Sequence, residues 1–245
     1  MNSTTPAPAR ADTRVTTPGF ANAIWQHHLA NRYRLVFYSL LLTLVIAPLL
    51  SLLGLGHLWL APLLALSVFS AVIGALGGWQ HAPYWKALAG LLLFIAALPE
   101  ALTGAWLNLG AIGICVFFAI VAIFVSVRYA LRPAEVGTEH VYAALSGYLL
   151  AGLVFAVLYF AVDRFVPGSL GPAGATAPVP VTLDQMIYFS FVTLATLGYG
   201  DIVPLSDLAR GLAVLEAVTG QLYIAVLVAT LISSYTASRG KPDRQ

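Results

Sequence analysis

Residues 193–201 read TLATLGYGD and lie between two long apolar segments, at about 140–163 and 207–236. Gly198 and Gly200 flank a tyrosine in this stretch. Because glycine has no Cβ atom, both positions can adopt a positive φ, which lets successive carbonyl groups face the same axis. The stretch therefore predicts an irregular backbone segment, with carbonyl oxygens turned to one side, between two long helices.

Residues 196–201, TLGYGD, resemble the selectivity filter of the potassium channel family, whose usual form is TVGYGD. The resemblance implies that K⁺ is the permeant ion and that backbone carbonyl groups replace the water around it. The residues implied to bind K⁺ are Thr196, Leu197, Gly198 and Tyr199, with the Thr196 hydroxyl at the inner end. The residues implied to support the filter are Gly200, Asp201, Tyr188 and Phe189. Tyr199 is expected to point away from the pore and to pack on the two aromatic side chains.

The resemblance covers about residues 140–236, and three positions depart from the family pattern. Leu197 stands where valine is usual, and Ala195 stands where threonine or serine is frequent. Val192 cannot supply the buried carboxylate that some relatives carry at this place. The carbonyl group of Leu197 is retained, so we expect conduction with altered side-chain packing behind the filter.

The composition of the chain is that of a membrane protein. Of its 245 residues, 60% are hydrophobic and 9% are charged, whereas a typical soluble domain has about 25% charged residues. Six apolar segments are each near the roughly 20 residues that span a bilayer. They lie at about 33–53, 58–77, 87–106, 109–130, 140–163 and 207–236, with a turn expected between Gly104 and Gly110. We predict an all-α membrane protein with six transmembrane helices, and with a re-entrant pore helix and the filter between the fifth and sixth.

Basic residues gather on one side of these six segments, which predicts the orientation of the chain. With a cytoplasmic N-terminus, the basic residues on the cytoplasmic side are Arg10, Arg14, Arg32, Arg34, Lys86, Arg128, Arg132, Arg239, Lys241 and Arg244. Only Arg164 and Arg210 fall on the outer side. We therefore expect a multi-pass protein of the cell membrane, with both termini cytoplasmic and the filter opening outward.

The fourth apolar segment lacks the charges that voltage sensing needs. Voltage-sensing channels carry an arginine-rich helix whose charges move through the membrane field. Residues 107–127 contain neither arginine nor lysine, and Arg128 and Arg132 follow only at the cytoplasmic end. Voltage gating is therefore not expected.

A short helix is predicted immediately before the filter. Thr182 and Gln185 have the spacing of a capping box, and Asp184 suits the first turn of a helix. The helix is expected to run to about Ala195, which is too short to cross a bilayer, so it would be re-entrant. Its C-terminal end carries a partial negative charge that favours a cation near the membrane centre. The Gly- and Pro-rich segment 167–180 before it predicts an exposed outer loop.

The last apolar segment carries the residues that the resemblance assigns to the cavity and the gate. They are Gly220, Gln221, Ile224, Val228 and Ile232. Gly220 acts either as a gating hinge or as a site of close helix packing, and both interpretations stay open. Two carboxylates within apolar stretches, Glu216 and Glu100, are candidates for a modulatory role.

The chain is expected to divide into four parts. These are a cytoplasmic tail with an interfacial helix (1–32), a four-helix transmembrane domain without sensing arginines (33–131), a pore domain (140–236) and a short cytoplasmic tail (237–245). Because one chain carries one filter segment, the resemblance implies a homotetramer in the lipid bilayer. We expect no enzyme activity, no organic cofactor, no metal site besides the K⁺ filter, no nucleic-acid partner and no soluble regulatory domain in this chain. A weakly selective cation channel and a non-conducting membrane subunit or transporter stay open as alternatives.

Overall fold

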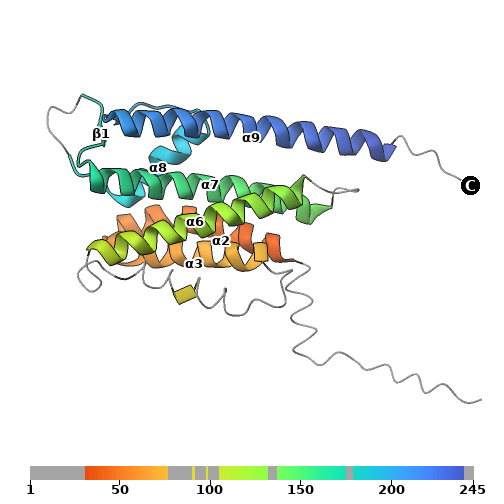
Figure 1. Ribbon diagram of the computed structural model, residues 1–245, viewed down its shortest axis with the longest axis horizontal. Helices are drawn as coiled ribbons and strands as arrows, with labels where there is room; N and C mark the ends of the chain where they lie inside the picture. The colour runs from red at the N-terminus through yellow and green to blue at the C-terminus, as the bar shows by residue number, and fades with distance from the viewer. Residues whose placement is uncertain are drawn as a thin grey trace, which may run out of the picture.

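A computed structural model of the protein describes residues 31–76, 90–91, 98, 105–131, 137–174 and 179–239. In this part of the chain most residues are helical, and the long helices lie side by side in an elongated bundle (Figure 1). The elements in chain order are α2 (Arg32–Leu52), α3 (Gly56–Leu76), α6 (Ala105–Ala130), α7 (Thr138–Phe165), β1 (Leu170–Pro172), α8 (Leu183–Leu194), β2 (Ile202–Pro204) and α9 (Asp207–Arg239).

Several of these helices have the length and composition of membrane spans. In the described part of the chain four segments are long and apolar enough to cross a membrane: Arg32–Leu50, Ile112–Ala130, Thr138–Phe165 and Asp207–Thr230. Helix α3 contains a shorter apolar stretch, Pro62–Gly74. The length and composition of these described helices confirm the prediction of an all-α membrane protein. Most of the third predicted segment, Glu100 and the two ends 1–30 and 240–245 lie outside the described residues.

The predicted turn between the third and fourth apolar segments is wrong. Helix α6 begins at Ala105, so the residues expected to end the third segment form its first turn, and Gly110 lies inside the helix. Alanine and leucine are good helix formers, and a single glycine costs a helix only about 1 kcal/mol. The glycine therefore does not end the helix.

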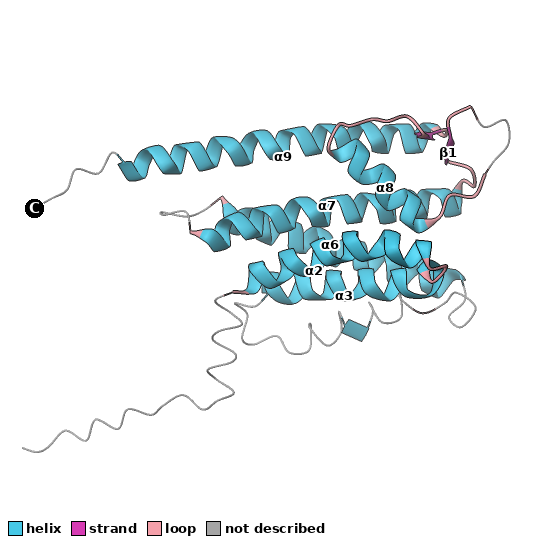
Figure 2. Cartoon of the chain, turned by 180° about the vertical axis from the view of Figure 1, so that it is seen from behind, coloured by secondary structure: helices cyan, strands magenta, loops and turns pink. Residues whose placement is uncertain are grey.

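Helix α7 lies at the centre of the bundle. Helices α2, α3 and α6 lie on one side of it, and α8 and α9 lie on the other (Figures 1 and 2). The main apolar core includes Leu40 of α2 and Leu150 and Leu153 of α7. Helix α3 approaches α2 closely at Gly74, where an added Cβ atom would lie 2.6 Å from Val36 Cγ2. These contacts make α7 the element that joins the leading helices to the rest of the chain.

A cluster of aromatic and charged side chains joins one end of α2, α6 and α7. The Arg32 guanidinium lies over the rings of Tyr33 and Tyr129, at 4.9 and 5.3 Å from their centroids. His140 stacks on Tyr129 with the ring centroids 4.6 Å apart. The backbone nitrogen of Tyr33 donates to Glu139 Oε2 at 3.2 Å. The cluster fixes the start of α7 against the two other helices.

The segment after α7 is more regular than the sequence predicts. Strand β1 pairs with β2 in an antiparallel ladder, in which Leu170 lies opposite Pro204, Gly171 opposite Val203 and Pro172 opposite Ile202. Leu170 is fully buried and packs in a cluster with Met186, Phe189 and Ala209. The expectation of an exposed loop over 167–180 is therefore wrong for residues 169–171, because a leucine here reaches the core between α7, α8 and α9.

Candidate functional site

Helix α8 begins where the sequence predicts it. The backbone nitrogen of Thr182 donates to Gln185 Oε1 at 2.9 Å, and the Met186 nitrogen donates to the Thr182 carbonyl at 3.0 Å. The first bond gives a partner to a backbone nitrogen that a helix end otherwise leaves without one, and the second is the first bond of the helix itself. The predicted capping box is confirmed, and it fixes the start of α8.

The C-terminal end of α8 turns directly into the glycine-containing stretch. The nitrogens of Leu197 and Gly198 both donate to the carbonyl oxygen of Val192, at 2.9 and 3.4 Å. The Thr196 nitrogen donates to the Thr193 carbonyl at 2.9 Å. The last turn of α8 thereby holds the amide groups of Thr196, Leu197 and Gly198 and sets the direction of the chain.

The backbone alternates in handedness through this stretch. Thr196, Gly198 and Gly200 have φ of 57°, 57° and 76°, whereas no positive φ occurs at Leu197 or Tyr199. The positive φ predicted for the two glycines is confirmed. Thr196 was not expected to share it, since a β-branched residue adopts this conformation only at a cost in strain. An alternating backbone of this kind turns successive carbonyl groups toward one side.

The carbonyl oxygens of residues 196–199 have no protein donor within the described residues. The stretch from Ala195 to Asp201 is exposed in the single chain, with Leu197 58% and Tyr199 68% exposed. Exposed apolar side chains beside unpaired carbonyl groups are unusual for a finished protein surface. The arrangement provides a row of oxygen ligands and a surface suited to contact with other protein.

Asp201 links the end of this stretch to α8 and to the segment after α7. The Tyr188 hydroxyl donates to Asp201 Oδ2 at 2.9 Å. The Asp201 carbonyl accepts from the Ala173 nitrogen at 3.1 Å, next to the β1–β2 ladder. The structure therefore brings together Tyr188 and Asp201, two of the predicted supporting residues.

Phe189 faces the other side of α8. It is buried, and its ring meets that of Tyr159 on α7 edge to face, with centroids 5.0 Å apart. In the single chain Tyr199 is largely exposed. Phe189 thus holds α8 against α7, and the expected packing of Tyr199 on the aromatic side chains of α8 stays a prediction.

Helix α9 lies very close to the end of α8 at Gly220. A Cβ atom added there would lie 2.5 Å from the Leu194 carbonyl oxygen and 3.0 Å from Leu194 Cδ1. The hydroxyl of Tyr148 on α7 donates to the same carbonyl at 3.3 Å. Of the two interpretations of Gly220, this geometry supports close packing directly.

The predicted cavity residues lie on the exposed side of α9. Ile224, Val228 and Ile232 are 42%, 47% and 61% exposed in the single chain. The side-chain nitrogen of Gln221, which precedes them, lies 3.4 Å from the Thr196 hydroxyl and donates to it, at the end of the glycine-containing stretch next to α8. The structure therefore joins Gln221 to Thr196, two residues 25 positions apart.

Glu216 is fully buried between α7, α8 and α9. Its carboxyl group contacts the hydroxyls of Tyr159 and Ser190, both also fully buried. Glu216 is a residue that the sequence indicates as a candidate, whereas its two partners were not predicted. A serine among mostly apolar neighbours was the only signal available for Ser190, and Tyr159 gave none.

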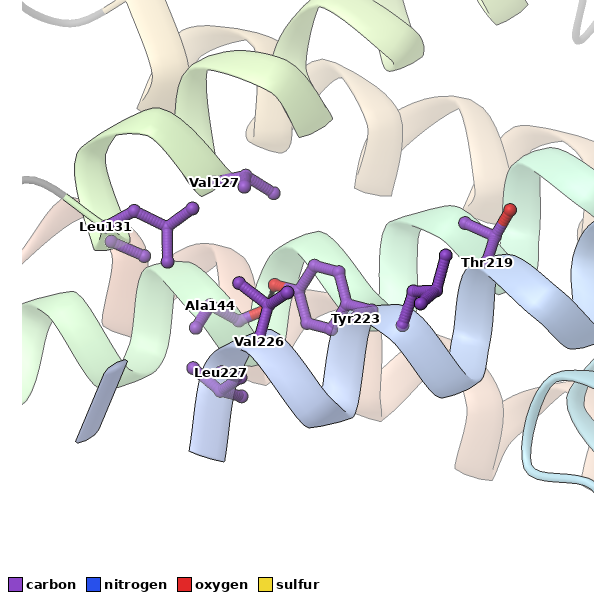
Figure 3. A pocket seen from close by; sticks show the side chains of 9 residues that line it. Val127, Leu131, Ala144, Thr219, Tyr223, Val226 and Leu227 are labelled. Atoms are coloured by element: carbon purple, nitrogen blue, oxygen red, sulfur yellow. Dashed lines mark hydrogen bonds between the residues drawn. The ribbon is translucent and has the colours of Figure 1, made fainter. Parts of the chain in front are cut away.

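A cavity of about 300 Å³ lies between α6, α7 and α9. Its lining is almost entirely apolar, and Figure 3 shows side chains from the three helices around it, among them Val127, Ala144 and Tyr223. The Tyr223 hydroxyl donates to the Ala144 carbonyl. This bond gives the hydroxyl a partner and joins α9 to α7.

Comparisons with known proteins point to one class. The sequence profile of a family described as "Ion channel" matches residues 144–237. The chain is 29% identical over 162 residues to the voltage-gated potassium channel Kch of Escherichia coli (strain K12), over 65% of this chain and 35% of that protein. It is 32% identical over 89 residues to the inward rectifier potassium channel Kirbac3.1 of Paramagnetospirillum magnetotacticum, over 36% of this chain and 27% of that one. It is 34% identical over 102 residues to the two pore potassium channel c of Oryza sativa subsp. japonica, over 42% of this chain and 20% of that one.

The chain spans between 20% and 35% of the length of these three relatives. The profile match begins within α7 and ends within α9, so it contains α8 and the glycine-containing stretch. Over this segment the chain is similar to an ion channel family and to proteins named as potassium channels.

Proposed function

We propose that this protein is a potassium-selective channel that conducts K⁺ passively through a pore formed by four copies of the chain. The observation that carries the proposal is the backbone from Thr196 to Gly200, with its alternating φ and with the carbonyl oxygens of residues 196–199 that accept no hydrogen bond from the described part of the chain. Carbonyl oxygens in such a row replace the hydration shell of K⁺. Thr196, Leu197, Gly198 and Tyr199 are the proposed ligands.

The exposure of this backbone supports a tetramer. Irregular backbone at membrane depth is tolerated only where it is buried in protein or lines water. In one chain the stretch is exposed, and so is the side of α9 that carries Ile224 and Val228. Four copies around a central axis would place the glycine-containing stretch at the narrow part of the pore. They would place the exposed side of α9 around a water-filled cavity.

The proposed membrane arrangement has six spans, the third of them at about 87–106. Helix α8 has 12 residues and is therefore about 18 Å long, shorter than the roughly 30 Å hydrocarbon core. We assign it as a re-entrant pore helix that enters from the outer side and ends at the membrane centre. The positive charges at the ends of the other spans support cytoplasmic termini in the cell membrane.

The remaining residues receive supporting roles in this proposal. Tyr188 and Asp201 would hold the outer end of the filter, and Gln221 would hold the Thr196 hydroxyl at the inner end. Gly220 would allow α9 to reach the end of the pore helix. Glu100 would act as a modulatory carboxylate of the third span.

Voltage is not proposed as the stimulus, although one relative is named a voltage-gated channel. The α6 helix carries no basic residue before Arg128. We expect the conductance of the protein in planar lipid bilayers to change little with membrane potential. A steep rise of the open fraction with depolarisation would contradict this part of the proposal.

The test of the function is ion flux through the purified protein in liposomes. K⁺ flux is expected to exceed Na⁺ flux by a wide margin. Gly198→Ala should abolish this preference, because alanine in the left-handed region costs about 1–2 kcal/mol in each copy. Gly113→Ala on α6, where an added Cβ meets nothing within 4 Å, is the matched control and should behave as the wild type. Equal K⁺ and Na⁺ fluxes would indicate the weakly selective cation channel, and absence of any flux would indicate the non-conducting subunit.

A further inference from the structure

Three fully buried polar side chains meet behind the glycine-containing stretch, each from a different helix. They are Tyr159 of α7, Ser190 of α8 and Glu216 of α9. We call these three residues the Glu216 relay. They lie where the proposed pore helix is held between the two long helices of its own chain, so the inference below rests on the proposed function and concerns what holds the filter in place.

The contacts within the relay form a chain of oxygen atoms. The Tyr159 hydroxyl lies 2.7 Å from Glu216 Oε2. Ser190 Oγ contacts Glu216 Oε1, and it also lies 2.7 Å from the carbonyl oxygen of Gly152 on α7. Three oxygen–oxygen contacts therefore need three hydrogen atoms between them.

If Glu216 is ionised, only two hydrogen atoms are available for these three oxygen–oxygen contacts. The hydroxyls of Tyr159 and Ser190 each supply one hydrogen, whereas a carboxylate and a backbone carbonyl supply none. The single hydrogen of the Ser190 hydroxyl could then bond either to Glu216 or to Gly152. In the other contact, two oxygen atoms would face each other with no hydrogen between them. With a proton on Oε1, Glu216 donates to Ser190, Ser190 donates to Gly152, and Tyr159 donates to Oε2. All three contacts then contain one hydrogen.

The surroundings of Glu216 also disfavour a charge. The titratable groups that face it are the tyrosines Tyr159 and Tyr148, both on α7, and α8 presents only Ser190. Within the described residues no arginine, lysine or histidine forms an ion pair with Glu216. A buried carboxylate without a cation is strongly unfavourable, and such groups take up a proton instead.

We propose that Glu216 carries a proton and acts as the positioning residue that fixes the pore helix, by donating to Ser190, which donates to the Gly152 carbonyl. The bond joins α9 to α8 and α8 to α7, one turn from the close approach of α9 at Gly220. Loss of the proton to the solvent at alkaline pH leaves the relay one hydrogen short. The end of α8 is then held less firmly, and the ratio of K⁺ flux to Na⁺ flux falls.

The Glu216→Gln variant tests the proton directly. Its side-chain amide can donate to Ser190 and accept from Tyr159, but it cannot lose a proton in this pH range. In liposomes the variant is expected to keep the K⁺/Na⁺ flux ratio of the wild type at neutral pH and to retain it at alkaline pH, where the wild-type ratio falls about tenfold. Ser190→Ala, which removes the middle of the relay, is expected to lower the ratio at every pH. A wild-type ratio that does not change with pH, or a Glu216→Gln ratio that falls with it, would overturn the regulatory part of the proposal.

An infrared difference spectrum of wild type minus Glu216→Gln gives a readout that does not need ion flux. The C=O stretching band of a protonated carboxylic acid is expected to appear at neutral pH, and to shift in the Ser190→Ala protein, because the acid then loses its acceptor. A carboxylate band in place of the acid band would overturn the proposal. If the wild type shows no preference for K⁺, the proposed function fails, and the spectrum still reports whether Glu216 holds a proton.

Discussion

Gly220 shows how one missing side chain sets the position of a helix. The Leu194 carbonyl oxygen occupies the place that a Cβ atom would need. Gly220→Ala is therefore expected to push α9 away from the end of α8 and to break the contact of Gln221 with Thr196. We predict a marked loss of K⁺ flux in liposomes, although alanine is the better helix former by about 1 kcal/mol.

Gly211 provides the matched control in the same helix. An added Cβ at this position meets nothing within 4 Å. Gly211→Ala should therefore keep or slightly raise thermal stability and leave flux unchanged. Equal behaviour of the two alanine variants would show that close packing at Gly220 is not what the channel requires.

The hydroxyl group of Tyr188 allows a second prediction. Tyr188→Phe removes the hydroxyl that donates to Asp201 and leaves the ring in place. The lost bond is worth about 1 kcal/mol, and a filter held less firmly at its outer end should cease to conduct sooner. We expect a faster decline of K⁺ current during sustained recording in planar bilayers. Tyr38→Phe, which removes an exposed hydroxyl on α2, should leave the time course of the current unchanged.

The residues of the site differ in how far the sequence could predict them. Gly198 and Gly200 indicate a positive φ at their positions, because glycine is the residue that adopts it freely. Thr196 gives no such signal, since its conformation is imposed by the amide bonds at the end of α8. Tyr159 and Ser190 were missed because a hydroxyl group gains its role only when folding brings it to Glu216.

The β1–β2 ladder is the element that the sequence did not reveal. Each strand has three residues, and the two are separated by more than twenty positions that include α8. Strands this short have no periodic pattern to detect, and their pairing depends on α8 and α9 being in place. By contrast, α2, α7 and α9 were predictable because long apolar runs fix them locally.

Leu170 allows a test of what the ladder contributes. It is fully buried between α7, α8 and α9. Leu170→Ala should lower the free energy of unfolding by about 2–5 kcal/mol, which we expect to see as a lower unfolding temperature of the purified protein in detergent. Val166→Ala, at a 45% exposed position just before the ladder, is the control and should change that temperature little. Similar, small shifts for both would mean that the ladder does not support the fold.

At the scale of the whole molecule, the exposed apolar surface of one chain predicts its assembly. The filter stretch and much of α9 are exposed, including Leu197, Tyr199 and Leu222. We expect native mass spectrometry of the protein released from mild detergent to give four times the chain mass of 26.0 kDa. Retention of that mass on tenfold dilution would indicate a stable tetramer, whereas a single-chain mass at all concentrations would contradict the proposed pore.

The central place of α7 has a consequence for biosynthesis. Its contacts with α2, α3 and α6, and with α8 and α9, are all made within one chain. A newly made subunit can therefore complete its helix packing as its segments leave the ribosome and enter the membrane, before it meets another copy. In the proposed tetramer, assembly would then join four folded units, and in a cell that makes two variants of the chain one defective subunit would impair a mixed pore.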